Sequence, residues 1–317
     1  MKYHVLLFII QVFLLSPNIA VGQCSLDKTN WSLVFEDNFN GTTSDLSNNW
    51  HFEYTHGRVL NPGESDEFTY MDPSNLSVSN GYLYIKHKRE IPAINYNGFS
   101  YDYSSGLIRS KIDDVPSCDG GSNGPGGMLY GMYEVRCKVQ KSSNLKSSAW
   151  LTSNNDWPPE IDLFEYKTEN KKSFFSTVHW LPGGSGNACQ NFYEYPYDIG
   201  DDFHTWTVVW TPEEVSWFFD GVLLKTDDRA AHIPGTTRPN EWELCRWDKM
   251  DLILNGRVTS PTSSFDDLIV DYVKFYKPQS LSPFTGSNGV QFTTYYNNHL
   301  VPTYLSLIHI SEPTRPY

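Results

Sequence analysis

One short acidic segment of the sequence could perform chemistry, because Glu160, Asp162 and Glu165 alternate there with apolar residues. In a regular β-strand, successive side chains point to opposite faces, so Glu160 and Asp162 would share one face and Glu165 would point to the other. A β-bulge with Leu163 or Phe164 as its extra residue would reverse this alternation once. We therefore expect a bulge that brings all three acids to one face.

The chemistry expected of these acids is proton transfer combined with nucleophilic attack. Three neighbouring carboxylates repel one another unless their ionisation is staggered, so one acid should stay protonated near neutrality. Two glutamates whose carboxyl groups lie about 5–5.5 Å apart suit retaining hydrolysis of a glycosidic bond. One glutamate attacks the anomeric carbon and the other protonates the leaving oxygen, while Asp162 would orient and stabilise Glu160. The alternative hypothesis is that these acids belong to a solvated edge strand, whose charges deter aggregation.

The elements that must position these acids are short β-strands. Runs rich in β-branched and aromatic residues, such as 133–139 and 215–219, are separated by Gly, Pro, Asn and Asp, and the mature chain shows no sustained helical periodicity. The dipeptide Asp220-Gly221 is typical of a two-residue hairpin and favours antiparallel pairing. We predict an all-β fold, an antiparallel β-sandwich of the jelly-roll type, in which one curved sheet carries a concave substrate cleft.

The chain divides into one large domain and three terminal segments. Residues 1–22 combine a weakly basic start, an apolar run and small residues, which predicts a signal peptide too short to span a membrane. Residues 23–277 suit one catalytic domain, 278–304 a linker or the start of a truncated C-terminal region, and 305–317 resemble a translated sequencing adapter, an artefact. We expect a secreted, extracellular protein, or one held in the periplasm or at the cell surface.

Composition disfavours several classes of partner. The 24 Lys and Arg against 37 Asp and Glu give a formal net charge of -13, which disfavours binding to nucleic acid and to anionic membranes. We expect no membrane span, and we expect a monomer. Five cysteines in an exported chain permit disulfides, whose pairing the sequence leaves open.

Several segments, taken together with the acidic one, resemble glycoside hydrolase family 16 in its bulge-containing form, the group of laminarinases, lichenases, agarases and carrageenases. The likeness spans most of residues 33–277 and is carried by 33–40, 103–108, 130–136, 202–206, 217–221 and 270–276. The resemblance implies a concanavalin-like jelly roll with the acids on its concave face. It makes Glu160 the nucleophile, Asp162 its supporting acid and Glu165 the acid/base.

Aromatic and histidine side chains near the acidic segment are candidates for substrate contact. The resemblance places His179 on the strand beside the catalytic one, where it would hydrogen-bond Asp162 or substrate, unless its role is structural. Trp150, Trp157 and Trp180 could stack on the apolar faces of sugar rings, with core packing as the alternative for each.

One departure from the family pattern puts the substrate in doubt. Asn255 resembles an asparagine near the family's cleft, but Gly256-Arg257 follows it where glucan-active members usually have small residues. Arg257 would narrow the cleft or meet a charged sugar substituent.

Catalysis requires no cofactor, but the resemblance implies a structural calcium ion on the convex side in some members. Its ligands here would be the Gly81 carbonyl and the Asp271 carboxylate, both oxygens as calcium prefers. The alternative is a turn glycine and a strand aspartate without metal.

Three functions are consistent with the sequence, and a polysaccharide is the expected partner in each. The leading one is a secreted retaining endo-β-glycosidase acting on β-1,3- or mixed-linkage β-glucan. The second is hydrolysis of a sulfated algal galactan, of the agarase, porphyranase or carrageenase type, for which Arg109, Arg136 or Arg257 would have to face the cleft as sulfate clamps. The third is a non-catalytic carbohydrate-binding sandwich. A transglycosylase would use the same acids as the leading candidate.

Overall fold

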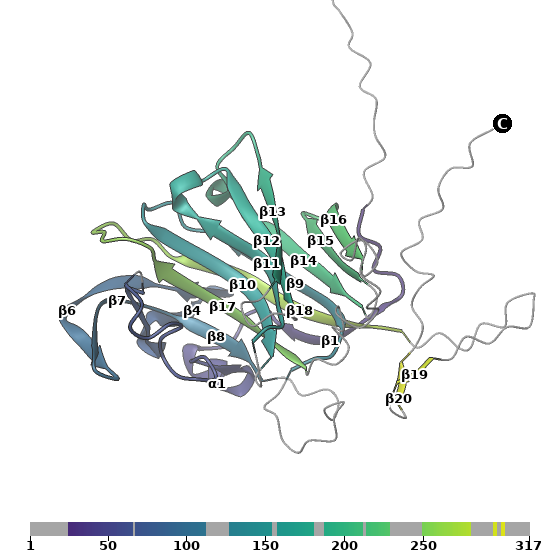
Figure 1. The fold of residues 1–317 in the computed structure, drawn as a ribbon, viewed down its shortest axis with the longest axis horizontal. Helices are drawn as coiled ribbons and strands as arrows, with labels where there is room; N and C mark the ends of the chain where they lie inside the picture. The colour runs from purple at the N-terminus through teal and green to yellow at the C-terminus, as the bar shows by residue number, and fades with distance from the viewer. Residues whose placement is uncertain are drawn as a thin grey trace, which may run out of the picture.

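Buried and exposed side chains alternate along many short strands, and the strands assemble into two antiparallel sheets stacked face to face (Figure 1). The computed structural model describes residues 25–65, 67–111, 127–153, 157–180, 187–211, 214–228, 249–279, 294–296 and 299–301. The predicted signal peptide and the segment 305–317 lie outside these residues. The predicted all-β antiparallel sandwich is confirmed.

The acidic segment lies in the middle of a seven-stranded sheet. The order across this sheet is β13 (Asn187–Glu194), β12 (Ser173–Trp180), β11 (Glu160–Lys167), β10 (Leu145–Ser153), β17 (Met250–Val258), β8 (Leu107–Ser110) and β2 (Trp50–His51). The acids are on β11, which is therefore flanked by strands on both sides and is not an edge strand. The alternative hypothesis of a solvated edge strand is wrong.

The second sheet covers the inner face of the first. Its order is β16 (Val222–Asp228), β15 (Glu214–Phe219), β14 (His204–Trp210), β9 (Gly131–Lys138), β18 (Leu268–Pro278), β5 (Tyr82–Ile85) and β4 (Leu76–Ser79), with β1 (Trp31–Asp37) paired to β18. The hairpin predicted at Asp220-Gly221 joins β15 to β16, and both residues have the positive φ that such a turn requires.

Smaller elements surround the sandwich. A third sheet contains β3 (Thr69–Met71), β7 (Phe99–Ser105) and β6 (His87–Tyr96), and its β3–β7 pair is parallel, an exception to the predicted antiparallel pairing. The other described elements are η1 (Thr43–Asp45), α1 (Leu46–Asn49), η2 (Pro73–Asn75), η3 (Thr168–Asn170), η4 (Ile199–Asp201), β19 (Thr294–Tyr296) and β20 (His299–Val301). Within the described residues, no helix has the length and apolar character needed to cross a membrane.

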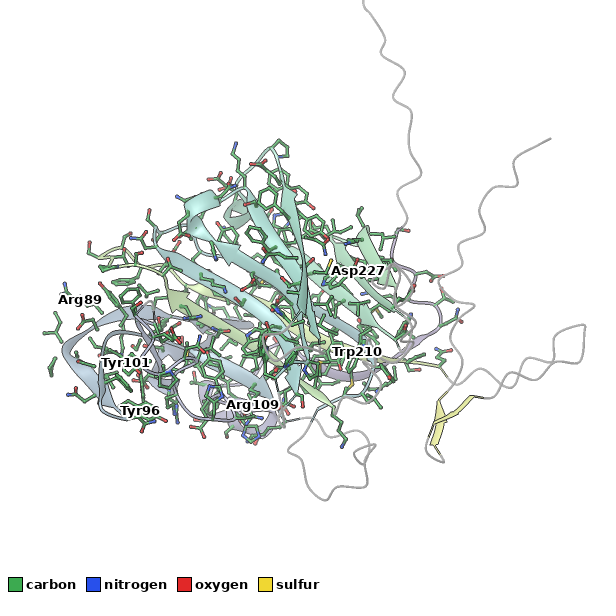
Figure 2. The ribbon with its side chains drawn as sticks, viewed as in Figure 1. Arg89, Tyr96, Tyr101, Arg109, Trp210 and Asp227 are labelled. Carbon is green, nitrogen blue, oxygen red and sulfur yellow. The ribbon has the colours of Figure 1, made fainter. Side chains whose placement is uncertain are left out.

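Aromatic side chains from both sheets fill the core between them. Phe164 of β11 packs on Trp206 of β14 with ring centroids 4.4 Å apart, and Phe174 of β12 packs on Phe219 of β15 at 5.2 Å. Trp210 of β14, labelled in Figure 2, is fully buried as well. These contacts fix β11 from behind, so its outward side chains are held on a rigid support.

The cysteines that the structure describes do not pair with each other. Cys137 is buried and Cys189 is partly exposed, and both are free. Cys24, Cys118 and Cys245 lie outside the described residues, so disulfide pairing among them stays a prediction.

Candidate active site

A β-bulge in β11 brings the three acids to one face of the seven-stranded sheet. Asp162 pairs with Thr177 and Glu165 with Phe175, so two residues of β11 stand opposite one residue of β12. The register with β10 shifts at the same place. The predicted bulge is therefore confirmed, and the side-chain alternation reverses once between Asp162 and Glu165.

Burial along β11 follows from this reversal. Leu163 and Phe164 are both buried in the core, which places Glu165 on the same face as Glu160 and Asp162. We call this surface the acidic face and define it by these three carboxyl groups. Cross-strand neighbours share a face, so the residues paired with the acids on β10 and β12 face the same way.

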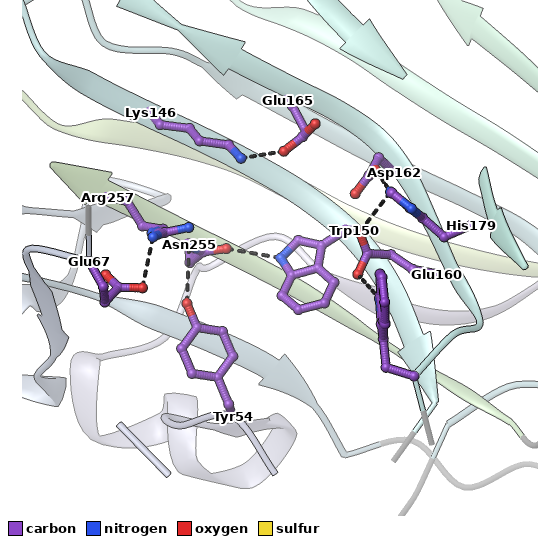
Figure 3. Close-up of polar contacts among 11 residues, drawn as sticks. Tyr54, Glu67, Lys146, Trp150, Glu160, Asp162, Glu165, His179, Asn255 and Arg257 are labelled. Atoms are coloured by element: carbon purple, nitrogen blue, oxygen red, sulfur yellow. Dashed lines mark hydrogen bonds and ion pairs between the residues drawn. The ribbon is translucent and has the colours of Figure 1, made fainter. Parts of the chain in front are cut away.

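Glu160 is held from two directions. The Trp157 indole nitrogen donates a hydrogen bond to Glu160 Oε2 at 2.9 Å, and His179 Nε2 lies 3.4 Å from Glu160 Oε1 (Figure 3). The same His179 nitrogen lies 3.6 Å from Asp162 Oδ2. His179 therefore connects the first two acids, and the structure brings together Glu160, Asp162, Trp157 and His179 as the sequence predicted.

Burial and mutual repulsion disfavour the ionised forms of two of the acids. Burial, followed by the charge of Asp162, raises the pKa of Glu160 to about 8, against the opposing effects of His179 and the Trp157 hydrogen bond. Burial, and then the charge of Glu165, raises the pKa of Asp162 well above its usual range. The expected staggering of ionisation is thus present, and these two carboxyl groups favour the protonated state.

Glu165 behaves differently because Lys146 of β10 forms an ion pair with its Oε1 (Figure 3). Burial raises the pKa of Glu165, but attraction to Lys146, with smaller contributions from Lys167 and His179, outweighs it, and the pKa lies below its usual value. The ion pair therefore favours the ionised form of the predicted acid/base in the free protein. Lys146 was not among the predicted site residues, although it is four residues from Trp150 on one strand, and strand alternation would have placed both on the same face.

The predicted cleft residues on β10 and β17 are joined to one another. The Trp150 indole nitrogen donates to Asn255 Oδ1 at 3.0 Å, and Asn255 Nδ2 donates to the Tyr54 hydroxyl at 3.4 Å. Trp150 is only 9 % exposed, so most of its ring surface is covered by the protein. Trp157 is 55 % exposed and offers far more ring surface. Trp180 ends β12, and its side chain lies outside the described part of the structure.

The three arginines considered as sulfate clamps all pair with carboxylates. Arg109 is buried and binds Asp251 at 2.6 Å, and Arg257 binds Glu67 at 2.7 Å. Arg136 alternates along β9 with the buried Val135 and Cys137, so it faces away from the core on the second sheet. Arg136 is therefore wrong as a clamp, because it is separated from the acidic face by the whole sandwich.

The predicted calcium ligands are on the second sheet. Gly81 follows β4 in a turn, and Asp271 belongs to β18, where its carboxylate forms an ion pair with Arg136. The oxygen ligands fit calcium in type, but a guanidinium already neutralises the Asp271 carboxylate, so calcium would have to displace Arg136. The calcium site stays a prediction.

The model of the family described as glycosyl hydrolases family 16 matches residues 94–255, a span that contains the bulged strand and ends at Asn255. The chain belongs to family 16 of the glycosyl hydrolases. The resemblance stated from the sequence is thus confirmed.

Named relatives and solved structures of this family give the same result. The chain is 25 % identical over 270 residues to the endo-1,3-1,4-beta-glycanase ExsH of Rhizobium meliloti, covering 80 % of this chain and 53 % of that protein. It is 26 % identical over 217 residues to a glucan endo-1,3-beta-glucosidase of Cryptopygus antarcticus, covering 66 % of this chain and 74 % of that one. The catalytic domain of a Thermotoga petrophila laminarinase superposes with a TM-score of 0.63 at 25 % identity, over 79 % of this chain and 99 % of that one. The chain spans about half the length of the first curated relatives, 53 %, 40 % and 53 %.

Proposed function

We propose that this family 16 protein is a retaining endo-β-glycosidase that hydrolyses β-1,3- or mixed-linkage β-glucan. The observation that carries the proposal is the bulge in β11, which places Glu160 and Glu165 on one face with Asp162 between them. Two carboxyl groups on one face are what double displacement at an anomeric carbon requires. The glucan preference is supported by the similarity to proteins named as endo-1,3- and endo-1,3-1,4-β-glucanases.

In the proposed reaction, Glu160 attacks the anomeric carbon and Glu165 gives its proton to the leaving oxygen. Trp157 and His179 orient Glu160 and favour its ionised form. Water then resolves the glycosyl-enzyme while Glu165, now ionised, accepts a proton from that water. Hydrolysis by this route needs two carboxyl groups and water, and no cofactor.

The contacts in the free protein favour the opposite ionisation of the two glutamates, so we infer that substrate binding changes their protonation. Lys146 holds Glu165 as a carboxylate, whereas the first step needs a proton there. A sugar hydroxyl that separates Lys146 from Glu165 would remove this attraction and leave burial as the main influence, which favours the protonated acid. Lys146 in turn favours the ionised Glu165 that the second step uses.

The other candidate functions receive less support. Arg136 faces away from the acidic face, and Arg109 and Arg257 are paired with carboxylates, so binding a sulfated galactan would require the Arg109 or the Arg257 pair to open. A sugar-binding sandwich without catalysis would have no need of three repelling carboxyl groups on one face. A transglycosylase differs only in the acceptor that resolves the glycosyl-enzyme.

We also propose that the protein acts outside the cell as a monomer. Export is supported by the signal-like residues 1–22, and the size of a polysaccharide substrate favours digestion outside the cell. N-terminal sequencing of secreted protein and size-exclusion chromatography with light scattering test these two points.

The deciding experiment measures reducing-sugar release from laminarin, mixed-linkage glucan, agarose, porphyran and carrageenan. We expect cleavage of the two glucans, with a loss of at least about a hundred-fold in Glu160→Ala and Glu165→Ala. Cleavage of the galactans alone would replace the proposed substrate, and binding without cleavage would replace the proposed reaction.

A second assay separates the roles of the two glutamates. An aryl glycoside with an acidic phenol as leaving group needs no proton donor, so Glu165→Ala should still release the phenol in the first step, whereas Glu160→Ala should not. The opposite pattern would exchange the two roles.

A further inference from the structure

Two phenylalanines continue the acidic face beyond Glu165, toward the outermost strand of the seven-stranded sheet. Glu165 pairs with Phe175 of β12, and Phe175 pairs with Phe192 of β13. The same register reaches back from Glu165 to Ser148 of β10 and then to Asn255 of β17. One row across five strands thus passes from Asn255 through Glu165 to two aromatic rings.

The alternation of β12 and β13 shows that these rings face outward. Phe174 and Tyr193, the sequence neighbours of the pair, contact each other with centroids 5.3 Å apart and pack in the core. Phe175 and Phe192 therefore point to the opposite side, the side of Glu165. Their own ring centroids are 5.1 Å apart, and Phe192 is 52 % exposed.

The core does not explain this pair. Single exposed apolar side chains are common on protein surfaces and need no function. Here, however, two aromatic rings lie side by side, on the face that carries the catalytic acids, and in the row of the residue that protonates the leaving group. The neighbours of Phe192 on the same face of β13 are the polar Gln190 and Glu194, both exposed, so the rings have a polar border.

We propose that Phe175 and Phe192 form a sugar-binding subsite for the leaving-group side of the polysaccharide. This inference rests on the proposed function, because it takes Glu165 as the acid that protonates the leaving oxygen. The ligand is the pyranose ring of a neutral glucan, whose apolar C–H face would lie on the phenylalanine rings.

The spacing of the strands suits this occupant. Neighbouring strands lie about 4.8 Å apart, so Phe175 is one strand spacing from Glu165 and Phe192 is two. A glucan that crosses the strands along this row would meet the acid/base and then the two rings in succession. The subsite would thereby add affinity for substrate units beyond the bond that is cut.

Binding without turnover tests the subsite. In a Glu160→Ala background, the affinity for laminarin and mixed-linkage glucan is measured by affinity electrophoresis and calorimetry, with and without Phe192→Ala. We expect Phe192→Ala to weaken binding by roughly three- to ten-fold, and Phe192→Trp to retain or strengthen it. Phe99→Ala, which removes an equally aromatic and exposed side chain from β7, is the control and should leave binding unchanged.

The possible outcomes separate this inference from the proposed function. Equal glucan affinity with and without Phe192→Ala would overturn the subsite and leave the glucanase intact. Absence of glucan binding by Glu160→Ala, together with absence of glucan hydrolysis by the wild type, would overturn the proposed function and the subsite with it. A dimer that Phe192→Ala converts to a monomer would also overturn the subsite, because a second copy would then be the occupant.

Discussion

The Trp217 indole nitrogen on the second sheet donates a hydrogen bond of 2.8 Å to the main-chain carbonyl of Asp162. Asp162 is the last residue before the bulge reverses the alternation of β11. A bulge disrupts the ladder locally, and a buried carbonyl without a partner is costly. Trp217 thus stabilises, from across the core, the backbone irregularity that positions the three acids.

Trp217→Phe should therefore destabilise the protein and reduce its activity. The substitution keeps an aromatic ring but leaves the Asp162 carbonyl without its donor, at a cost of about 1–3 kcal/mol. Trp210→Phe is a matched control, because Trp210 is equally buried and its indole nitrogen has no hydrogen-bond partner among the described residues. Thermal unfolding should show a melting temperature several degrees lower for Trp217→Phe than for Trp210→Phe. Equal melting temperatures and equal glucanase activity would contradict this role.

Lys146→Met should move the acidic limit of activity to higher pH. Of the two catalytic glutamates, Glu165 has the lower pKa in the free protein and Glu160 the higher one, so Glu165 sets the acidic limit of the pH profile. Burial raises and Lys146 lowers the pKa of Glu165, so loss of the cation raises this pKa and moves the acidic limit to higher pH. Lys167, His179 and Asp162 also face Glu165 and remain in the variant. The pH profile of kcat/KM on mixed-linkage glucan measures the shift, since it reports the free enzyme.

Lys146→Arg keeps the positive charge and should leave this limit near that of the wild type. Lys138→Met removes a lysine from the second sheet and is the control. An acidic limit that is the same in Lys146→Met and in the wild type would show that the ion pair does not set the protonation of Glu165.

Glu160→Gln should make the protein more stable at pH 8 while abolishing hydrolysis. The folded-state pKa of Glu160 is raised from 4.5 to about 8, so the folded state binds this proton more tightly than the unfolded state does. The protonated Glu160 carboxyl group contributes most to the stability of the folded protein below pH 4.5, and this contribution is lost as the pH rises to about 8. The uncharged amide does not undergo this loss.

Melting temperatures at pH 4.5 and pH 8 test this prediction. The difference between Glu160→Gln and the wild type should be near zero at the lower pH and positive at the higher one, by about 2–4 °C for each kcal/mol gained. Glu194→Gln, at an exposed position of β13, should show no such change. A pH-independent difference would mean that burial of Glu160 does not raise its pKa.

Calcium and Arg136 should compete for Asp271. Because the Arg136–Asp271 ion pair is partly exposed, its loss should cost no more than about 1 kcal/mol. If the proposed calcium site exists, Arg136→Gln should show a larger increase in melting temperature on adding calcium than the wild type does. Equal melting temperatures in calcium and in EDTA for both proteins would show that Asp271 does not bind calcium.

Local patterns predicted the fold because each depends on a short stretch of chain. The Asp220-Gly221 turn, the alternating strands and the need for a bulge after Asp162 follow from backbone geometry alone. Which distant strands lie beside each other could not be predicted from such local patterns. The contact of Lys146 with Glu165 depends on β10 lying beside β11, and the paired arginines depend on Asp251 and Glu67, which are far from them in sequence.

Some of the missed features did have a local signal. Arg136 alternates with the apolar Val135 and Cys137, which already indicates that it faces away from the core. Phe175 is the second residue of the apolar pair Phe174-Phe175, and strand alternation requires that only one of the two be in the core. Which one is buried, however, depends on the register set by the bulge in the neighbouring strand.

The bulge also affects how this chain must be aligned with its relatives. In a strand without an extra residue, side chains on one face are an even number of positions apart, so the partner of Glu160 would be expected at position 164. That position here is Phe164, which is fully buried against Trp206. An ungapped alignment with an unbulged relative would therefore transfer the role of proton donor to a core phenylalanine, and a one-residue gap within β11 is needed to match Glu165 with its counterpart.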